Sequence, residues 1–241
     1  MSQQVDPVTL QVIDGALHTI AKEMGHVLYR MSYSSIIRES QDLGAGLFDA
    51  QGNTLCESDT SPLHIGSIPG YLRGIAETMS GEWKPGDIVI HNHPYYGASH
   101  SPDICVVMPV FYKGELVGFS ANTAHHVDIG AATPGLIIDI PDVYAEGMLF
   151  KGVKLYEEGV RNDAIWKYFL DNTRTPYLAE GDIEAQIAAV KLGAKHFLEM
   201  FEQYGKETML SSFDQLMAYT ENLMRTEIAK IPDGEYRAEG F

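Results

Sequence analysis

Histidines gather in a short central stretch of the sequence, with one aspartate at a spacing suited to holding a metal ion. Five of the nine histidines lie between His91 and His126. His100 and Asp103 belong to a loop that contains glycine and proline, and His125 lies near the end of a predicted strand. Two imidazoles and one carboxylate form a mixed donor set that suits Zn²⁺, Mn²⁺ or Fe²⁺ and leaves positions open for water or substrate.

The same residues also admit a structural interpretation. A single histidine in a strand is more often packed or exposed than bound to a metal, and a His-x-x-Asp spacing arises easily by chance. Asp42 is ambiguous too, because a polar residue between a helix and a strand commonly caps or turns the chain. The residue types alone therefore allow either a metal site or a structural cluster.

Hydrophobic spacing indicates the long elements that must position this cluster. Apolar residues at alternating steps of four and three predict an amphipathic helix over about 8–31, capped by Asp6. A second helix is predicted over about 182–204, with Asp182 as its cap, and a third over about 211–230.

The middle of the chain has the pattern of short strands joined by turns. Apolar runs on both sides of glycine-containing turns predict two hairpins, and further runs predict one more strand and a short helix. These elements are the hairpins around Gln51-Gly52-Asn53 and Lys113-Gly114-Glu115, the strand 88–90 and the helix 71–79. Loops with short strands are predicted over 130–159. The pattern predicts an α+β fold, with antiparallel strands and metal-binding loops in the middle and long amphipathic helices at both ends.

Composition and charge fit an acidic globular protein. Of 241 residues, 45% are hydrophobic, and the formal net charge is −16. Such acidity disfavours nucleic acid and anionic membranes as partners, because both attract basic patches. With no signal peptide and no long apolar run, a cytoplasmic location is expected. We expect one metal-binding unit over 1–241, with a mixed strand and loop catalytic part over about 1–175 and a helical part over about 182–241.

Motifs spread over essentially the whole chain give it a resemblance to a known family. The motifs are Asp6-Pro7-Val8-Thr9, Asp42, Phe48-Asp49-Ala50-Gln51-Gly52, His64-Ile65-Gly66-Ser67-Ile68-Pro69, Pro85-Gly86-Asp87, the loop from Asn92 to Asp103, Pro109-Val110-Phe111, Ala124-His125-His126-Val127-Asp128-Ile129-Gly130, Asp171-Asn172-Thr173-Arg174 and Ile231-Pro232-Asp233-Gly234. With these motifs, the chain resembles the hydantoinase B/5-oxoprolinase family, which also includes acetone and acetophenone carboxylase subunits. Related subunits are considerably longer, so the resemblance implies the N-terminal portion of a longer subunit.

The resemblance implies a bound divalent metal, Zn²⁺ in the lactam hydrolases and Mn²⁺ in the ketone carboxylases. It assigns His100, Asp103 and His125 as metal ligands, with Asp42 as the fourth.

One departure from the family pattern leaves the fourth ligand open. Family members commonly carry Asn-Asp-Pro-Tyr where this chain has Asn92-His93-Pro94-Tyr95, so His93 is the alternative to Asp42. A neutral histidine in place of a carboxylate would favour Zn²⁺ over Mn²⁺. His126 and Asp128 are expected as catalytic residues that orient a ligand ring or carry a proton.

The implied function is that of one subunit in an ATP-dependent hetero-oligomer. The sequence contains no phosphate-binding loop, so ATP chemistry must come from elsewhere. By resemblance, a hydantoinase A-type, ATP-binding partner phosphorylates a cyclic amide of the lactam, hydantoin or 5-oxoproline type, which then opens at this subunit. The alternatives are a subunit of an ATP-dependent ketone carboxylase and a scaffold without catalytic residues, whose long helices pack against other subunits. The substrate, the choice between Zn²⁺ and Mn²⁺, and the stoichiometry stay open.

Overall fold

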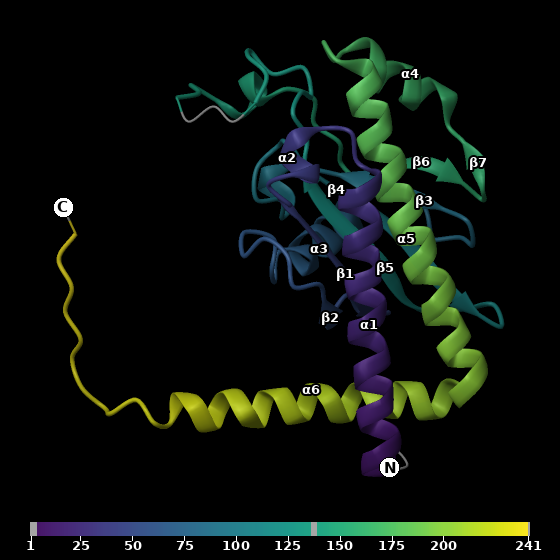
Figure 1. The fold of residues 1–241 in the computed structure, drawn as a ribbon, viewed down its shortest axis with the longest axis vertical. Helices are drawn as coiled ribbons and strands as arrows, with labels where there is room; N and C mark the ends of the chain where they lie inside the picture. The colour runs from purple at the N-terminus through teal and green to yellow at the C-terminus, as the bar shows by residue number, and fades with distance from the viewer. Residues whose placement is uncertain (1–3, 136–138, 241) are drawn as a thin grey trace.

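A computed structural model describes residues 4–135 and 139–240, which form a seven-stranded sheet with helices on both faces (Figure 1). The strand order is β2-β1-β5-β4-β3-β6-β7, and every neighbouring pair is antiparallel. The elements are α1 (Pro7–Met31), α2 (Ser35–Arg38), β1 (Leu43–Asp49), β2 (Thr54–Glu57), α3 (Ile68–Thr78), β3 (Ile88–His91), η1 (Pro94–Tyr96), β4 (Asp103–Tyr112), β5 (Glu115–His125), η2 (Val143–Glu146), β6 (Val153–Glu157), β7 (Val160–Arg161), α4 (Asp163–Asp171), α5 (Pro176–Tyr204) and α6 (Lys206–Ile228). The predicted α+β class is confirmed.

The long helices α1 and α5 lie side by side across one face of the sheet (Figure 1). The predicted apolar stripe of α1 is buried there, and Oδ1 of Asp6 accepts hydrogen bonds from the backbone N–H groups of Val8 and Thr9. Burying such a stripe, more than intrinsic helix propensity, stabilises a helix in a folded protein. The predicted helix over 8–31 is therefore confirmed in both its extent and its cap.

The prediction that Asp182 caps a helix is wrong. Helix α5 begins earlier, at Pro176, and Asp182 lies within it with no exposed surface. Its Oδ1 accepts hydrogen bonds from the backbone N–H groups of Tyr33, at 2.7 Å, and Ser34, at 3.0 Å. The carboxylate thus holds the chain that leaves α1 rather than the end of its own helix, a partnership that local sequence does not reveal.

Helix α3 covers the other face of the sheet and packs on residues of β3, β4 and β5. Two of its glycines allow a close approach to the loop after β3. A Cβ at Gly70 would lie 2.7 Å from the carbonyl oxygen of Gly97, and one at Gly74 only 1.6 Å from that of Tyr96. Glycine is required at both positions because helix backbone meets loop backbone directly.

Both predicted hairpins are present, as β1–β2 and β4–β5. Lys113 and Gly114, both with positive φ, form the turn between β4 and β5. In 130–159 the structure has η2 and β6 among loops, and residues 136–138 of that prediction lie outside the described residues. Helix α4 was not predicted.

Helix α6 packs on the body of the protein through its first turns, where Met209 and Phe213 are buried, and then extends away from it (Figure 1). From Ala218 onward every described residue is exposed. Among the helices within 4–135 and 139–240, none has an apolar stretch long enough to cross a bilayer.

Candidate metal centre

The predicted histidine–aspartate cluster lies at the open end of the β4–β5 hairpin. Asp103 is the first residue of β4, His125 is the last of β5, and the two are paired directly across the strands. Because side chains alternate along a strand, Asp103 shares the face of Cys105, which packs in the core under α3. His100 reaches the pair from the loop that precedes β4. The structure thus brings His100, Asp103 and His125 together.

Three ligand atoms meet at hydrogen-bonding distance in this cluster. Oδ1 of Asp103 lies 2.8 Å from Nε2 of His100 and 3.1 Å from Nδ1 of His125. The two ring nitrogens are 3.2 Å apart. The side chains of Asp103 and His125 are 6% and 3% exposed, whereas that of His100 is 31% exposed. Access from solvent is therefore on the side of His100.

The electrostatics of the cluster favour a charged carboxylate. Burial alone would raise the pKa of Asp103, but the hydrogen bonds with His100 and His125 outweigh it and hold the pKa far below its usual range. Burial likewise opposes the charge on His100, yet its hydrogen bond with Asp103, and the charges of Asp103, Glu146 and Asp42, raise the pKa of His100. The carboxylate of Asp103 is thus held in its charged form, and its negative charge attracts a proton, or a cation, to the point where the three side chains meet.

The donor set fits a divalent transition metal. Metal–ligand distances of about 2.0–2.2 Å in a tetrahedral Zn²⁺ site place neighbouring ligand atoms about 3.4 Å apart. The three separations here, 2.8, 3.1 and 3.2 Å, would need to open by about 0.2–0.6 Å to reach that value. Two imidazoles with one carboxylate match the ligand preference of Zn²⁺ and Mn²⁺. A Ca²⁺ site, in contrast, would need 6–8 oxygen ligands.

Asp42 lies next to the cluster but binds another residue. It precedes β1, and its carbonyl oxygen accepts a hydrogen bond from the backbone N–H of His125 at 3.1 Å. Its Oδ1 lies 3.0 Å from Nε2 of His64, which is almost fully buried. The side chain of Asp42 is 25% exposed. Asp42 therefore lies beside His125, which in turn is paired with Asp103 on the next strand. Among the described residues, its side chain has no hydrogen bond to either of them.

His93 is not brought into the cluster. It follows β3, is 8% exposed, and packs its ring against that of Tyr96 at 5.1 Å between centroids. Burial and the positive charge of Lys151 lower its pKa. The neighbouring His91 has a structural role, because its Nε2 lies 2.9 Å from the carbonyl oxygen of Tyr96 and its Nδ1 accepts from the N–H of Gly152.

The structure places His126 and Asp128 away from the three ligand atoms. Nε2 of His126 lies 2.9 Å from Oε1 of Gln186 on α5, on the opposite face of the sheet from His125. Asp128 is buried, and its Oδ1 forms an ion pair with Nη1 of Arg174 at 3.0 Å. Among the described residues, neither side chain has a hydrogen bond to His100, Asp103 or His125.

Sequence reasoning assigned no role to two residues that contact the site. Ser99 donates from Oγ to Oδ2 of Asp103 at 2.5 Å, and His64 holds Asp42. Ser99 could have been noticed as the residue directly before His100. The role of His64 depends on its close packing against Gly44, where a Cβ would lie 2.7 Å from the Cβ of His64. That packing is evident only from the three-dimensional structure.

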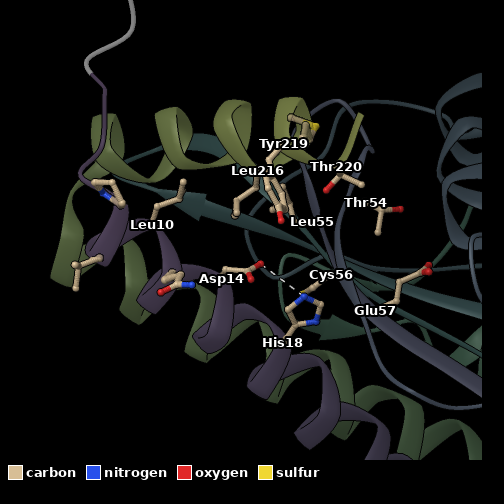
Figure 2. A pocket seen from close by; sticks show the side chains of 14 residues that line it. Leu10, Asp14, His18, Thr54, Leu55, Cys56, Glu57, Leu216, Tyr219 and Thr220 are labelled. Atoms are coloured by element: carbon tan, nitrogen blue, oxygen red, sulfur yellow. Dashed lines mark ion pairs between the residues drawn. The ribbon is translucent and has the colours of Figure 1, made fainter. Parts of the chain in front are cut away.

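A large cavity lies elsewhere, between the start of α1, strand β2 and α6 (Figure 2). Its volume is about 940 Å³, and many of its lining residues are apolar. At its wall, Asp14 and His18 form an ion pair, in which Oδ1 of Asp14 lies 3.6 Å from Nε2 of His18. None of His100, Asp103 and His125 lines this cavity, so it is separate from the candidate centre.

Comparisons with known proteins bear on the whole chain. A family model described as hydantoinase B/oxoprolinase matches residues 6–241. A Pseudomonas sp. (strain NS671) protein, provisionally named as the B component of a D-/L-hydantoinase, is 53% identical over 99% of this chain and 41% of its own length. The beta chain of the caprolactamase of Pseudomonas jessenii is 35% identical over 96% of this chain and 40% of its own length. The chain thus spans about two fifths of the length of these relatives.

Two solved structures share the fold. The ATP-dependent caprolactamase of Pseudomonas jessenii superimposes with a TM-score of 0.86 at 33% identity, over 96% of this chain and 40% of that chain. A nucleotide-free acetone carboxylase superimposes with a TM-score of 0.79 at 21% identity, over 86% and 28%. At that identity, the second likeness concerns the fold alone.

Proposed function

Because this chain belongs to the hydantoinase B/oxoprolinase family, we propose that it provides the metal centre of an ATP-dependent enzyme that opens a cyclic amide. The observation that supports this function best is the convergence of His100, Asp103 and His125 within hydrogen-bonding distance of one another. The names of two relatives, a hydantoinase subunit and a caprolactamase subunit, describe enzymes of cyclic amides. The hydantoinase relative is 53% identical to this chain and the caprolactamase relative 35%, so a hydantoin-type ring is the first substrate to test, before a lactam.

We assign His100, Asp103 and His125 as metal ligands, and Asp42 as the fourth. Asp42 is preferred to His93 because it lies beside His125 in the row of strand ends and contributes to the charge felt by His100. Zn²⁺ or Mn²⁺ held there would supply Lewis-acid chemistry, which polarises an amide oxygen or activates water for attack. His126 and Asp128 are given no part in the proposed chemistry, because His126 contacts Gln186 on the opposite face of the sheet and Asp128 is buried in its ion pair with Arg174.

The protein's own residues would prepare the site for that ion. Asp103 and His125 are buried and fixed by strand pairing, which keeps two donors in place before the ion arrives. Such preorganisation limits the reorganisation needed during the reaction. The partly exposed His100 would form the side from which a substrate approaches. ATP would be used through a partner subunit, in line with the names of the relatives, which describe single subunits of larger enzymes.

Elemental analysis tests the metal centre directly. We expect about one Zn or Mn per wild-type chain after purification, and loss of that metal in His100→Ala, Asp103→Ala and His125→Ala. His196→Ala is the matched control, because His196 is a partly exposed histidine of α5 that pairs with Glu199. Wild-type protein without metal, or full metal content in the three variants, would overturn the assignment.

An activity assay distinguishes the opening of a cyclic amide from the carboxylation of a ketone. With ATP and the partner subunit, we expect a hydantoin or a lactam to be opened, and the Asp103→Ala variant to lose this activity. Incorporation of labelled bicarbonate into a ketone, without ring opening, would instead identify a carboxylase.

A further inference from the structure

Asp103 uses its two carboxylate oxygens differently. Oδ1 faces the two histidines, at 2.8 and 3.1 Å, whereas Oδ2 accepts a hydrogen bond from the hydroxyl of Ser99 at 2.5 Å. The carboxylate is nearly buried, so rotation would exchange these partners at a high cost. The contacts of Oδ2 therefore determine which oxygen is presented to the ligand cluster.

The hydroxyl of Ser99 is itself held by a second residue. The phenol oxygen of Tyr71 lies 2.9 Å from Oγ of Ser99, and it also accepts from the backbone N–H of Ser99 at 3.3 Å. A serine hydroxyl has only one hydrogen, and Ser99 donates it to Asp103. In the contact between the two hydroxyls, only Tyr71 can then be the donor, and its single hydrogen is shared between Oγ of Ser99, at 2.9 Å, and the more distant carbonyl oxygen of Asp103. The shorter contact gives a directed chain from Tyr71 through Ser99 to Asp103.

Tyr71 belongs to a different element, and that element is fixed against the site loop. Tyr71 is fully buried in α3, and its hydroxyl also lies 3.3 Å from the carbonyl oxygen of Asp103. Gly70 and Gly74 bring the backbone of α3 against that of residues 96 and 97. Helix α3 therefore holds the phenol at a constant position relative to Ser99.

We propose that Ser99, held by Tyr71, is a positioning residue that occupies Oδ2 of Asp103 and leaves Oδ1 alone to bind the metal. This inference rests on the metal centre proposed above and adds that Asp103 binds through one oxygen only. Hydrogen-bonding partners of metal ligands orient them, and their loss typically lowers metal affinity by about 10- to 100-fold.

The test compares four variants of the full chain with the wild type by the dissociation constant for Zn²⁺, measured by competition with a chelator. We expect Ser99→Ala to weaken binding by about 10- to 100-fold, and Tyr71→Phe to weaken it less. Ser99→Thr keeps the hydroxyl and should bind nearly as well as the wild type. Ser101→Ala is the matched control: Ser101 is buried in the same loop, and its hydroxyl has no hydrogen-bond partner among the described residues. Urea unfolding of each variant identifies any that fail to fold.

A second readout does not depend on metal. In a crystal structure of the metal-free Ser99→Ala variant, we expect the carboxylate of Asp103 to rotate away from His100 and His125. Wild-type affinity in Ser99→Ala, or an unmoved carboxylate, would overturn the positioning role. If the wild type binds no Zn²⁺ yet the carboxylate rotates in the variant, the metal centre is refuted while Ser99 still positions Asp103.

Discussion

Replacing Gly74 with alanine tests how α3 packs on the loop that leads to the proposed metal centre. An added Cβ would lie 1.6 Å from the carbonyl oxygen of Tyr96 and 2.9 Å from Nε2 of His91. Real Cβ contacts essentially never fall below 3.0 Å. The helix and the loop must therefore separate by more than about 1 Å, a movement that a close-packed interior does not absorb freely.

The magnitude follows from the opposing contributions. Overpacking typically costs about 1–3 kcal/mol, and here the obstacle is backbone, which has no alternative rotamer. The separation would also weaken the hydrogen bond between His91 and Tyr96, worth about 1 kcal/mol. Higher helix propensity returns about 1 kcal/mol. We therefore expect the free energy of unfolding to fall by about 3 kcal/mol.

Urea denaturation followed by circular dichroism measures this change. Gly15→Ala is the matched control, because it makes the same substitution at an exposed position of α1 with no atom within 4 Å. Its free energy of unfolding should rise by about 1 kcal/mol. If Gly74→Ala were as stable as the wild type, direct backbone contact between α3 and the loop would be refuted.

Two further predictions concern buried polar groups. Burial lowers the pKa of His91 to about 4 from 6.5, so the unfolded chain binds one more proton between these pH values, and stability falls as the pH falls through this window. We expect the free energy of unfolding to fall by roughly 3 kcal/mol across this window. Urea unfolding at several pH values measures this fall, and the free energy of unfolding should depend less on pH in His91→Gln. Asp182→Ala should lower the free energy of unfolding by about 3 kcal/mol, because two backbone N–H groups lose a charged acceptor. Glu184→Ala, at an exposed position of the same helix, should change stability by less than about 0.5 kcal/mol; an equal loss there would contradict the role of Asp182.

Local patterns were enough to predict much of the fold. The apolar spacing of α1 and the Asp6 cap are interactions between residues close in sequence, and so are the turns of both hairpins. Helix α4 was missed because it is short and has only two buried residues, Trp166 and Phe169, so its periodicity is weak. The start of α5 was misplaced because Asp182 is a typical capping residue. Here it accepts a hydrogen bond from the backbone N–H of Tyr33, 149 residues away, instead of capping its own helix.

The candidate site could be predicted only for residues that local sequence patterns bring together. His100 and Asp103 lie in one loop, and the predicted hairpin connects that loop to His125. The strand order, which puts Asp42 beside His125, is not evident from local patterns. The contacts of Tyr71 with Ser99 and of His64 with Asp42 join residues 28 and 22 positions apart, and they depend on the packing of α3 and the loop before it.

The position of Asp103 and His125 at the open end of a hairpin also has a consequence for folding. The hairpin closes at Lys113 and Gly114, so the two proposed ligands meet only after pairing has propagated along the whole length of β4 and β5. A slip of one residue would turn one of the two side chains to the opposite face of the sheet. An ion that requires both donors would therefore bind only the native register, and would stabilise that register against its slipped competitors.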